Sequence, residues 1–366
     1  MVKFIKNISN IGLVKIIDNS IFLCYRNGKL FFNENLLVTN VESQSFWKKN
    51  DILYYHNMEG EHCFYDFNTS KTIKGKNGIA WFTIENNLAF CSYDLNRGND
   101  RWHWKSGILD LNSQIITKEY PSAKDMSLCA MSNNSYILFQ NIQTLCSISK
   151  TDGKAIWQSQ IPKLGYWEDP LTKLHYDYKI GHIIGVISNI LWVDIKQGTL
   201  LGIDIETGEA KHTLKMPSPP SPQYEEGLYC ALFHRDNTTV YDPKINKLVC
   251  LNTYHYYEVD LNKDEPTLEF RLLKNEFMTH QVLATHSSRR CMDDDSIYFL
   301  DTDNTAIVAL NRVTFKIDWV YHFTGAEAEE VGVLMTIEVM SDKLYVLDHL
   351  GHLFIFEKDE DKKLNN

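Results

Sequence analysis

The sequence predicts an all-β fold, because one short unit of turns and strands recurs along the whole chain. Each copy starts with a turn rich in Asn or Asp, continues through two short apolar strands separated by a second turn, and leads to a third strand. The copies recur about every 46 residues, within the ~40 to 50 residues of a four-stranded propeller blade. We therefore predict a single β-propeller domain over residues 1–366. The polar residues that open the copies are Asn19, Asp51, Asn87, Asn134, Asn189, Asn246, Asp295 and Asp342.

Three copies show the unit most clearly, and each has room for four strands. They occupy residues 133–157, 188–214 and 295–321. A further apolar run stands upstream of several copies, as in SLCAMS, GHIIGVIS and VGVLMTIEV. Such a run supplies the first strand, so we expect blades of four antiparallel strands.

The two ends of the chain are expected to share one blade. The 18 residues before the first copy and the 25 residues from Asp342 onward together have the length of one more blade. We predict that VKFIK, residues 2–6, forms the outer strand of the final blade and closes the ring, which protects sheet edges. Eight blades are favoured. Seven blades with one irregular unit are the alternative, because the first interval of 32 residues is short for four strands. Residues 359–366 are expected to form a disordered charged tail.

The turn before the fourth strand has a recurring sequence, seen in KTDGKAIW, IETGEAKHTL and NRVTFKIDWVY. It resembles the quinoprotein-like (pyrroloquinoline-quinone-like) propeller repeat, in which an ALDxxTGKxxW segment joins the third and fourth strands and the Trp docks between blades. The resemblance implies the propeller fold. It implies no quinone, because quinone-binding members have an adjacent cysteine pair and a calcium site, and this chain has no adjacent cysteines. We therefore expect no cofactor. The matching residues are Asp152, Gly153, Lys154, Trp157, Asp204, Thr207 and Gly208.

Composition and charge favour a cytoplasmic protein with a protein partner. The formal net charge of -10 argues against a nucleic-acid partner and suits a basic protein. No apolar stretch approaches the ~18 to 20 residues needed to cross a membrane, and the first residues lack the apolar segment of a signal peptide. The eight cysteines form no CxxC pair and mostly stand in apolar runs, so we expect free buried thiols in a reducing compartment.

Three connections are long or acidic enough to form a binding surface. They are residues 161–179, residues 216–227 with four prolines, and residues 324–330. By strand order they belong to one face. Aromatic side chains beside carboxylates are typical of protein interfaces. In the alternative interpretation the prolines stiffen a linker, the Trp covers a blade edge and the glutamates keep the surface soluble. The predicted partner-binding residues are Trp167, Glu168, Asp169, Tyr176, Tyr178, Tyr224, Glu225, Glu226, Glu327, Glu329 and Glu330.

No catalytic or metal-binding residue is predicted. Among the thirteen histidines, His349 lies close in sequence to His352, and His280 lies close to His286. Cys230 also stands near His234. None of these pairs has the spacing of a structural zinc site. The carboxylates 293–295 are expected to form a solvated turn. The chain contains no GxSxG, P-loop or HExxH motif.

The favoured function is a non-enzymatic, monomeric or one-to-one binding protein for a basic partner, and an immunity protein that neutralises a toxin is its narrowest form. A propeller enzyme that acts on a polysaccharide or small molecule in the central funnel is the first alternative. A scaffold subunit of a larger assembly is the second. The identity of the partner, the oligomeric state of this chain and any ligand or ion in the central channel stay open.

Overall fold

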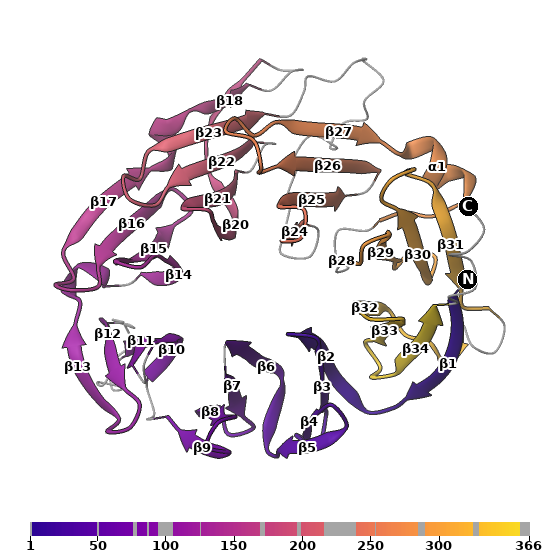
Figure 1. Cartoon of the computed structure of the whole chain (residues 1–366), viewed down its shortest axis with the longest axis horizontal. Coiled ribbons are helices and arrows are strands. Elements are labelled where there is room, and N and C mark those ends of the chain that lie inside the picture. Colours follow the sequence, from indigo (N-terminus) through magenta and orange to yellow (C-terminus); the bar gives the residue numbers. More distant parts are fainter. Residues whose placement is uncertain are drawn as a thin grey trace. The chain divides into compact units, whose positions relative to one another are not determined.

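The structure of the chain is a computed structural model (Figure 1) that describes residues 2–49, 51–75, 79–85, 88–93, 105–124, 126–168, 173–195, 199–215, 239–252, 254–284, 290–324 and 329–358. The chain divides into two compact units. The first unit contains Met1–Ile73, Asp236–Glu258 and Arg271–Asn366, and the second contains Lys74–Arg235 and Val259–Phe270. The expectation of one domain over the whole chain stays a prediction.

The described part of the chain contains eight four-stranded antiparallel sheets, which confirms the eight-blade prediction. The sheets of the first unit are β2 (Ile11–Ile17), β3 (Ser20–Tyr25), β4 (Leu30–Phe32) and β5 (Asn35–Val38); β6 (Val41–Lys49), β7 (Ile52–Asn57), β8 (His62–Asp66) and β9 (Lys71–Lys74); β28 (Arg290–Met292), β29 (Ser296–Asp301), β30 (Ala306–Asn311) and β31 (Ile317–His322); and β32 (Leu334–Met340), β33 (Lys343–Asp348), β34 (Leu353–Lys358) and β1 (Val2–Ile8).

The second unit has three such sheets and one hairpin. The sheets are β10 (Ile79–Glu85), β11 (Leu88–Tyr93), β12 (Lys105–Asp110) and β13 (Ile115–Glu119); β14 (Ser127–Met131), β15 (Ser135–Asn141), β16 (Thr144–Ser149) and β17 (Ala155–Gln160); and β20 (Ile180–Ile187), β21 (Ile190–Ile195), β22 (Thr199–Asp204) and β23 (Ala210–Lys215). The hairpin pairs β18 (Tyr166–Glu168) with β19 (His175–Asp177). The remaining sheet contains β24 (Thr239–Asp242), β25 (Lys247–Asn252), β26 (His255–Asp260) and β27 (Leu268–Leu272). The short helices are η1 (Pro121–Ala123), η2 (Ile161–Leu164) and α1 (Lys274–Thr279).

A tight turn explains how four strands fit into the short first interval. β4 and β5 have only three and four residues. Asn33 and Glu34 join them, both with positive φ, as the two-residue hairpin turn that matches strand twist requires. Asn33 also accepts a hydrogen bond from the backbone N–H of Ile21 at 3.0 Å. The first blade is therefore regular but small, and the alternative of seven blades with one irregular unit is wrong.

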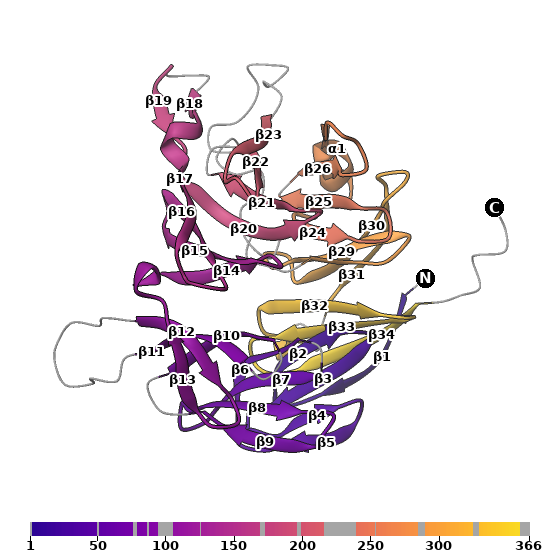
Figure 2. The ribbon, with the colours of Figure 1, turned by 60° about the vertical axis from the view of Figure 1, so that its left-hand side comes forward.

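The predicted pairing of the two chain ends is confirmed. β1 runs antiparallel to β34, with Val2 opposite Lys358 and Ile8 opposite Leu353. The two strands lie side by side in Figure 2. Phe4 also packs edge-on against Phe356, with 5.5 Å between ring centroids. The first strand is therefore the outer strand of the last sheet and covers an edge of β34 that would otherwise be open.

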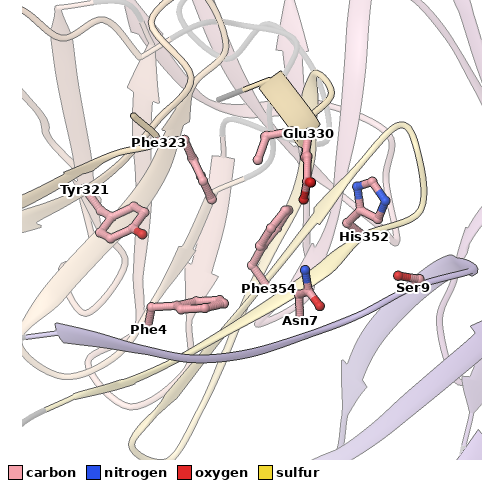
Figure 3. A pocket seen from close by; sticks show the side chains of 9 residues that line it. Phe4, Asn7, Ser9, Tyr321, Phe323, Glu330, His352 and Phe354 are labelled. Atoms are coloured by element: carbon pink, nitrogen blue, oxygen red, sulfur yellow. The ribbon is translucent and has the colours of Figure 1, made fainter. Parts of the chain in front are cut away.

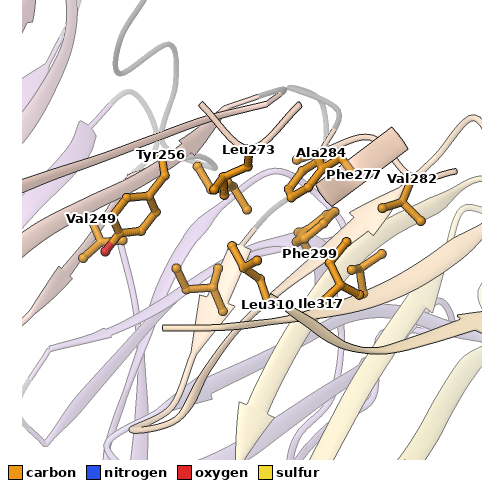
Figure 4. Packing of buried hydrophobic residues seen from close by; sticks show 12 residues of the cluster. Val249, Tyr256, Leu273, Phe277, Val282, Ala284, Phe299, Leu310 and Ile317 are labelled. Atoms are coloured by element: carbon orange, nitrogen blue, oxygen red, sulfur yellow. The ribbon is translucent and has the colours of Figure 1, made fainter. Parts of the chain in front are cut away.

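Apolar clusters between neighbouring sheets form the core. Every residue of β21 and of β29 is buried, which explains why these strands are apolar without alternation. In the first unit, α1 places Phe277 on the sheet of β28–β31, where its ring stacks on Phe299 at 5.3 Å (Figure 4). Glu276 fixes this helix, because its carboxylate accepts hydrogen bonds from Lys316 and from the N–H of Ile317.

One turn recurs between the third and fourth strands of five sheets. The side chain of its first residue accepts backbone hydrogen bonds, as Asp204 does from the N–H groups of Glu206 and Thr207. The residue four positions later has positive φ. The turns start at Asp66, Asp110, Ser149, Asp204 and Asn311, and the residues with positive φ are Ser70, Gln114, Gly153, Gly208 and Phe315.

The glycines of this turn receive an aromatic side chain from the preceding sheet. The indole N–H of Trp157 donates to the carbonyl of Ile205 at 2.9 Å, and a Cβ on Gly208 would lie 2.5 Å from the Trp157 ring. Tyr120 packs on Gly153 in the same way. The Trp docking that the resemblance implies is therefore confirmed at this pair of sheets.

The cysteines are mostly buried, as the sequence predicted. Six of the seven cysteines in the described ranges are buried free thiols, and burial raises the pKa of Cys24 to about 12. Cys230 and residues 359–366 lie outside the described residues. Within the described ranges, no helix has the length and apolar character that a membrane span requires.

We predict that Gly208→Ala destabilises the protein more than Gly60→Ala does. Both glycines have positive φ, which costs an L-residue about 1–2 kcal/mol. A Cβ at Gly60 has no atom within 4 Å, whereas a Cβ at Gly208 overlaps the Trp157 ring, and such overpacking costs a further ~1–3 kcal/mol. Urea unfolding of both variants measures the difference. Equal losses of unfolding free energy would contradict the docking role of Trp157.

Candidate functional site

The longest predicted connection contains an ordered hairpin. η2 leads into β18, and β18 pairs with β19, with Trp167 opposite Tyr176 and Glu168 opposite His175. Figure 2 shows the hairpin extending away from β17. Its base is anchored in the core by Ile161, which is fully buried. The connection is therefore a defined projection of the second unit.

Polar contacts within the hairpin neutralise Glu168. Its carboxylate lies 3.2 Å from Nε2 of His175 and 3.3 Å from Nζ of Lys173. Hydrogen bonding by His175, and then by Lys173, lowers the pKa of Glu168. Tyr166 stacks on the His175 ring at 4.3 Å. Glu168 was predicted to contact a basic partner, but the structure gives its charge two partners inside the hairpin.

Three large side chains of the hairpin are exposed. The exposed fractions are 51% for Tyr166, 56% for Leu174 and 41% for Tyr176. Tyr176 was among the predicted residues, whereas sequence reasoning missed Tyr166 and Leu174. A prediction of the β18–β19 pairing would have identified them, because Tyr166 and Leu174 lie in the same projecting segment as Tyr176.

Tyr178 lies in the core and not on the surface that the predicted contact with a partner needs. Only 1% of the residue is exposed, and it belongs to the core cluster that includes Ile161. Its ring lies over Gly165, where an added Cβ would come within 2.7 Å of it. The absence of a side chain at Gly165 makes room for the ring.

Several predicted residues cannot be placed. Glu329 and Glu330 are described and exposed. The side chain of Trp167 and the residues Asp169, Tyr224, Glu225, Glu226 and Glu327 lie outside the described residues. The common face expected for the three connections stays a prediction.

A pocket of about 190 Å³ lies in the first unit, between the sheet of β28–β31 and the sheet that β1 completes (Figure 3). It is lined from β1 and the turn that follows, from the end of β31, from the segment before β32, and from the start of β34. The connection from β31 to β32 and the turn after β1 each follow the outer strand of a sheet. Here they meet the turn between β33 and β34, which joins the second and third strands of the last sheet, as strand order predicts. The lining residues are Phe4, Asn7, Ser9, Tyr321, Phe323, Glu330, Val331, His352 and Phe354.

Four aromatic rings form the apolar wall of the pocket. Phe323 packs edge-on against Phe354, with centroids 4.9 Å apart, and against Tyr321 at 5.1 Å. Phe4 lies 6.5 Å from Phe354 in a tilted arrangement. Phe323 and Phe354 are buried, and Phe4 and Tyr321 are partly exposed. The rings support one another, so the wall is pre-formed.

A buried carboxylate organises the polar side of the pocket. Asp348 accepts hydrogen bonds from the backbone N–H groups of Gly332, Gly351 and His352 and lies 3.0 Å from Nδ1 of the His352 ring. We assign a proton to Nδ1, because the carboxylate accepts this bond. Asp348 thus ties the segment before β32 to the turn before β34.

Glu330 supplies the one carboxylate of the pocket lining. It is exposed, and within the described residues it makes no hydrogen bond or ion pair. Loop length and charge singled it out in the sequence. The aromatic residues were missed because they come from three separate strands, although the predicted pairing of residues 2–6 with the last blade would have placed Phe4 beside β34.

Two of the described histidines and one residue of the acidic run make structural contacts. His352 bonds to Asp348, and His280 lies 3.5 Å from Glu276. Asp293 is partly buried and accepts hydrogen bonds from Lys358 and the Tyr298 hydroxyl. It therefore belongs to a structured turn rather than to a fully solvated one. Among the described residues, no group of three His, Cys, Asp or Glu side chains could hold a metal ion.

No protein-family model matches the sequence, and no curated protein matches it either. The resemblance to the quinoprotein-like repeat therefore stays an interpretation of the turns. Solved structures similar to this chain include BamB from Moraxella catarrhalis, with a TM-score of 0.53 and 12% identity over 98% of this chain and 100% of that one. The C-terminal WD40 domain of Sif2 has a TM-score of 0.56 and 8% identity, over 98% of this chain and 99% of that one. Apo AztD from Citrobacter koseri has a TM-score of 0.51 and 13% identity, over 88% of each chain. These likenesses show the fold alone, a β-propeller of eight four-stranded blades.

We predict that Asp348→Ala destabilises the protein and disrupts the pocket. The substitution leaves buried N–H groups without their charged acceptor, at a cost of about 3 kcal/mol. Asp303→Ala is the matched control, because Asp303 is an exposed turn residue of the same unit, and we expect a change of about 0.5 kcal/mol or less. Urea unfolding tests both variants. Similar values for the two would show that the Asp348 contacts do not support the fold.

Proposed function

We propose that this chain is a non-enzymatic β-propeller that holds one basic protein partner on its projecting connections. The observation that carries the proposal is the hairpin β18–β19, which presents Tyr166, Leu174 and Tyr176 to solvent. Large apolar side chains exposed on a projection are typical of protein interaction sites, and aromatic residues dominate the binding energy of interfaces.

The hairpin is suited to binding because its exposed groups are already held in place. Strand pairing fixes the backbone, and the Tyr166–His175 stack and the Glu168 contacts order side chains before a partner arrives. Such pre-organisation lowers the entropy that is lost on association. The hairpin therefore supports a stable contact with a folded partner.

The charge of the chain supports a basic partner. The formal net charge is -10, and a field of one sign raises the rate at which oppositely charged proteins meet. The proposal includes a cytoplasmic location, which the buried free thiols favour, and a one-to-one complex. In its narrowest form the partner is a toxin that this chain neutralises.

The experiment is affinity capture of the tagged protein from its own cell extract, with mass spectrometry of the eluate. We expect one stoichiometric basic protein that is lost at high salt. The double variant Tyr166→Ala and Tyr176→Ala should bind this protein at least ~10-fold more weakly, since interface aromatics commonly contribute more than 1 kcal/mol each.

The matched control replaces two other exposed apolar residues of the second unit, Ile115→Ala and Ile156→Ala. It should bind the partner as the unmodified protein does. The proposal fails if no partner is recovered, or if the control and hairpin variants weaken binding equally.

A further inference from the structure

We propose that the pocket between β31 and the β1–β34 pair binds the cationic side chain of a lysine or arginine that the partner inserts. This inference rests on the proposed function and deepens it, because it states which chemical group of the partner is recognised. The juxtaposition that carries it is an aromatic wall beside a single uncompensated carboxylate (Figure 3).

The aromatic wall favours a cation. Phe4, Tyr321, Phe323 and Phe354 line one small cavity, and Phe4 and Tyr321 are partly exposed. The faces of aromatic rings carry negative potential and attract ammonium and guanidinium groups. The apolar stem of a lysine or arginine would meanwhile cover the ring carbons. A long cationic side chain therefore matches this wall along its whole length.

Glu330 supplies charge complementarity. Its carboxylate lines the same cavity and has no hydrogen-bonded or ionic partner within the described residues. Glu168 of the hairpin differs, because Lys173 and His175 already compensate it. The His352 ring, which also lines the cavity, is held in place by Asp348. A cation entering the pocket would thus meet one carboxylate, and no Lys or Arg side chain is among the lining residues.

The size of the pocket favours one side chain over a whole small molecule. Its volume is about 190 Å³, below the ~300–1,000 Å³ of pockets that enclose drug-sized ligands. The Asp348 hydrogen bonds and the pairing of β1 with β34 hold its walls in place before binding. A single inserted side chain is the ligand that such a small, pre-formed cavity fits.

The first test uses a lysine probe that requires no partner. Saturation-transfer NMR would follow the binding of Nα-acetyl-lysine methylamide to the full-length protein. The expected dissociation constant is about 1–10 mM, because a solvent-accessible cation–π and ion-pair contact contributes only a few kcal/mol. Nα-acetyl-norleucine methylamide, which lacks the ammonium group, should bind at least ~5-fold more weakly.

Two neighbouring glutamates give a matched pair of variants. Glu330→Gln should weaken binding of the lysine probe about 5-fold, because it removes the carboxylate of the pocket. Glu329→Gln removes the same charge from an adjacent exposed residue that does not line the pocket, and it should leave binding unchanged. Tyr321→Leu, which keeps the wall apolar, should reduce the preference for lysine over norleucine, because Glu330 and the other rings remain. Each residue is at least partly exposed, so the variants are expected to fold.

Three outcomes would overturn the inference. They are no detectable binding of the lysine probe, equal binding of the norleucine probe, and equal effects of Glu330→Gln and Glu329→Gln. The result is separate from that of the proposed function. A pocket that binds the lysine probe in a protein that captures no partner would overturn the function alone, and a captured partner with an inert pocket would overturn this inference alone.

Discussion

The structure depends on sheets whose central strands are apolar on both faces. β21 and β29 bury every residue, so a sheet of this kind exposes apolar surface on two sides unless another sheet covers it. The core clusters accordingly draw their members from adjacent sheets. Trp157, which packs on Gly208 of the next sheet, shows how a side chain and a glycine turn set this contact.

The same constraint builds the pocket. β34 needs an outer strand, and β1 supplies it, which brings Phe4 beside Phe354 from the other end of the chain. The sheet of β28–β31 then packs against this sheet and contributes Phe323. A cavity lined from distant parts of the sequence is therefore a consequence of completing the last sheet. Its carboxylate comes from the connection that precedes β32.

The fold was more predictable from the sequence than the candidate site. The period of the repeats and the arithmetic of the chain ends predicted eight four-stranded blades, because every blade repeats the same local turns and apolar runs. The site depends on contacts between strands remote in sequence, which local patterns do not encode. Tyr178 shows the limit. Its place in a long connection suggested exposure, but the space above Gly165 admits its ring to the core.

The account makes the hairpin and the pocket the two contact sites of one basic partner. Hydrogen exchange of the free protein and of its purified complex, followed by mass spectrometry, tests this most directly. The account predicts slower amide exchange in the complex at residues 166–168 and 173–177 of the hairpin and at residues 4–9 and 329–333 of the pocket. Unchanged exchange at both places, with protection elsewhere in the chain, would contradict it.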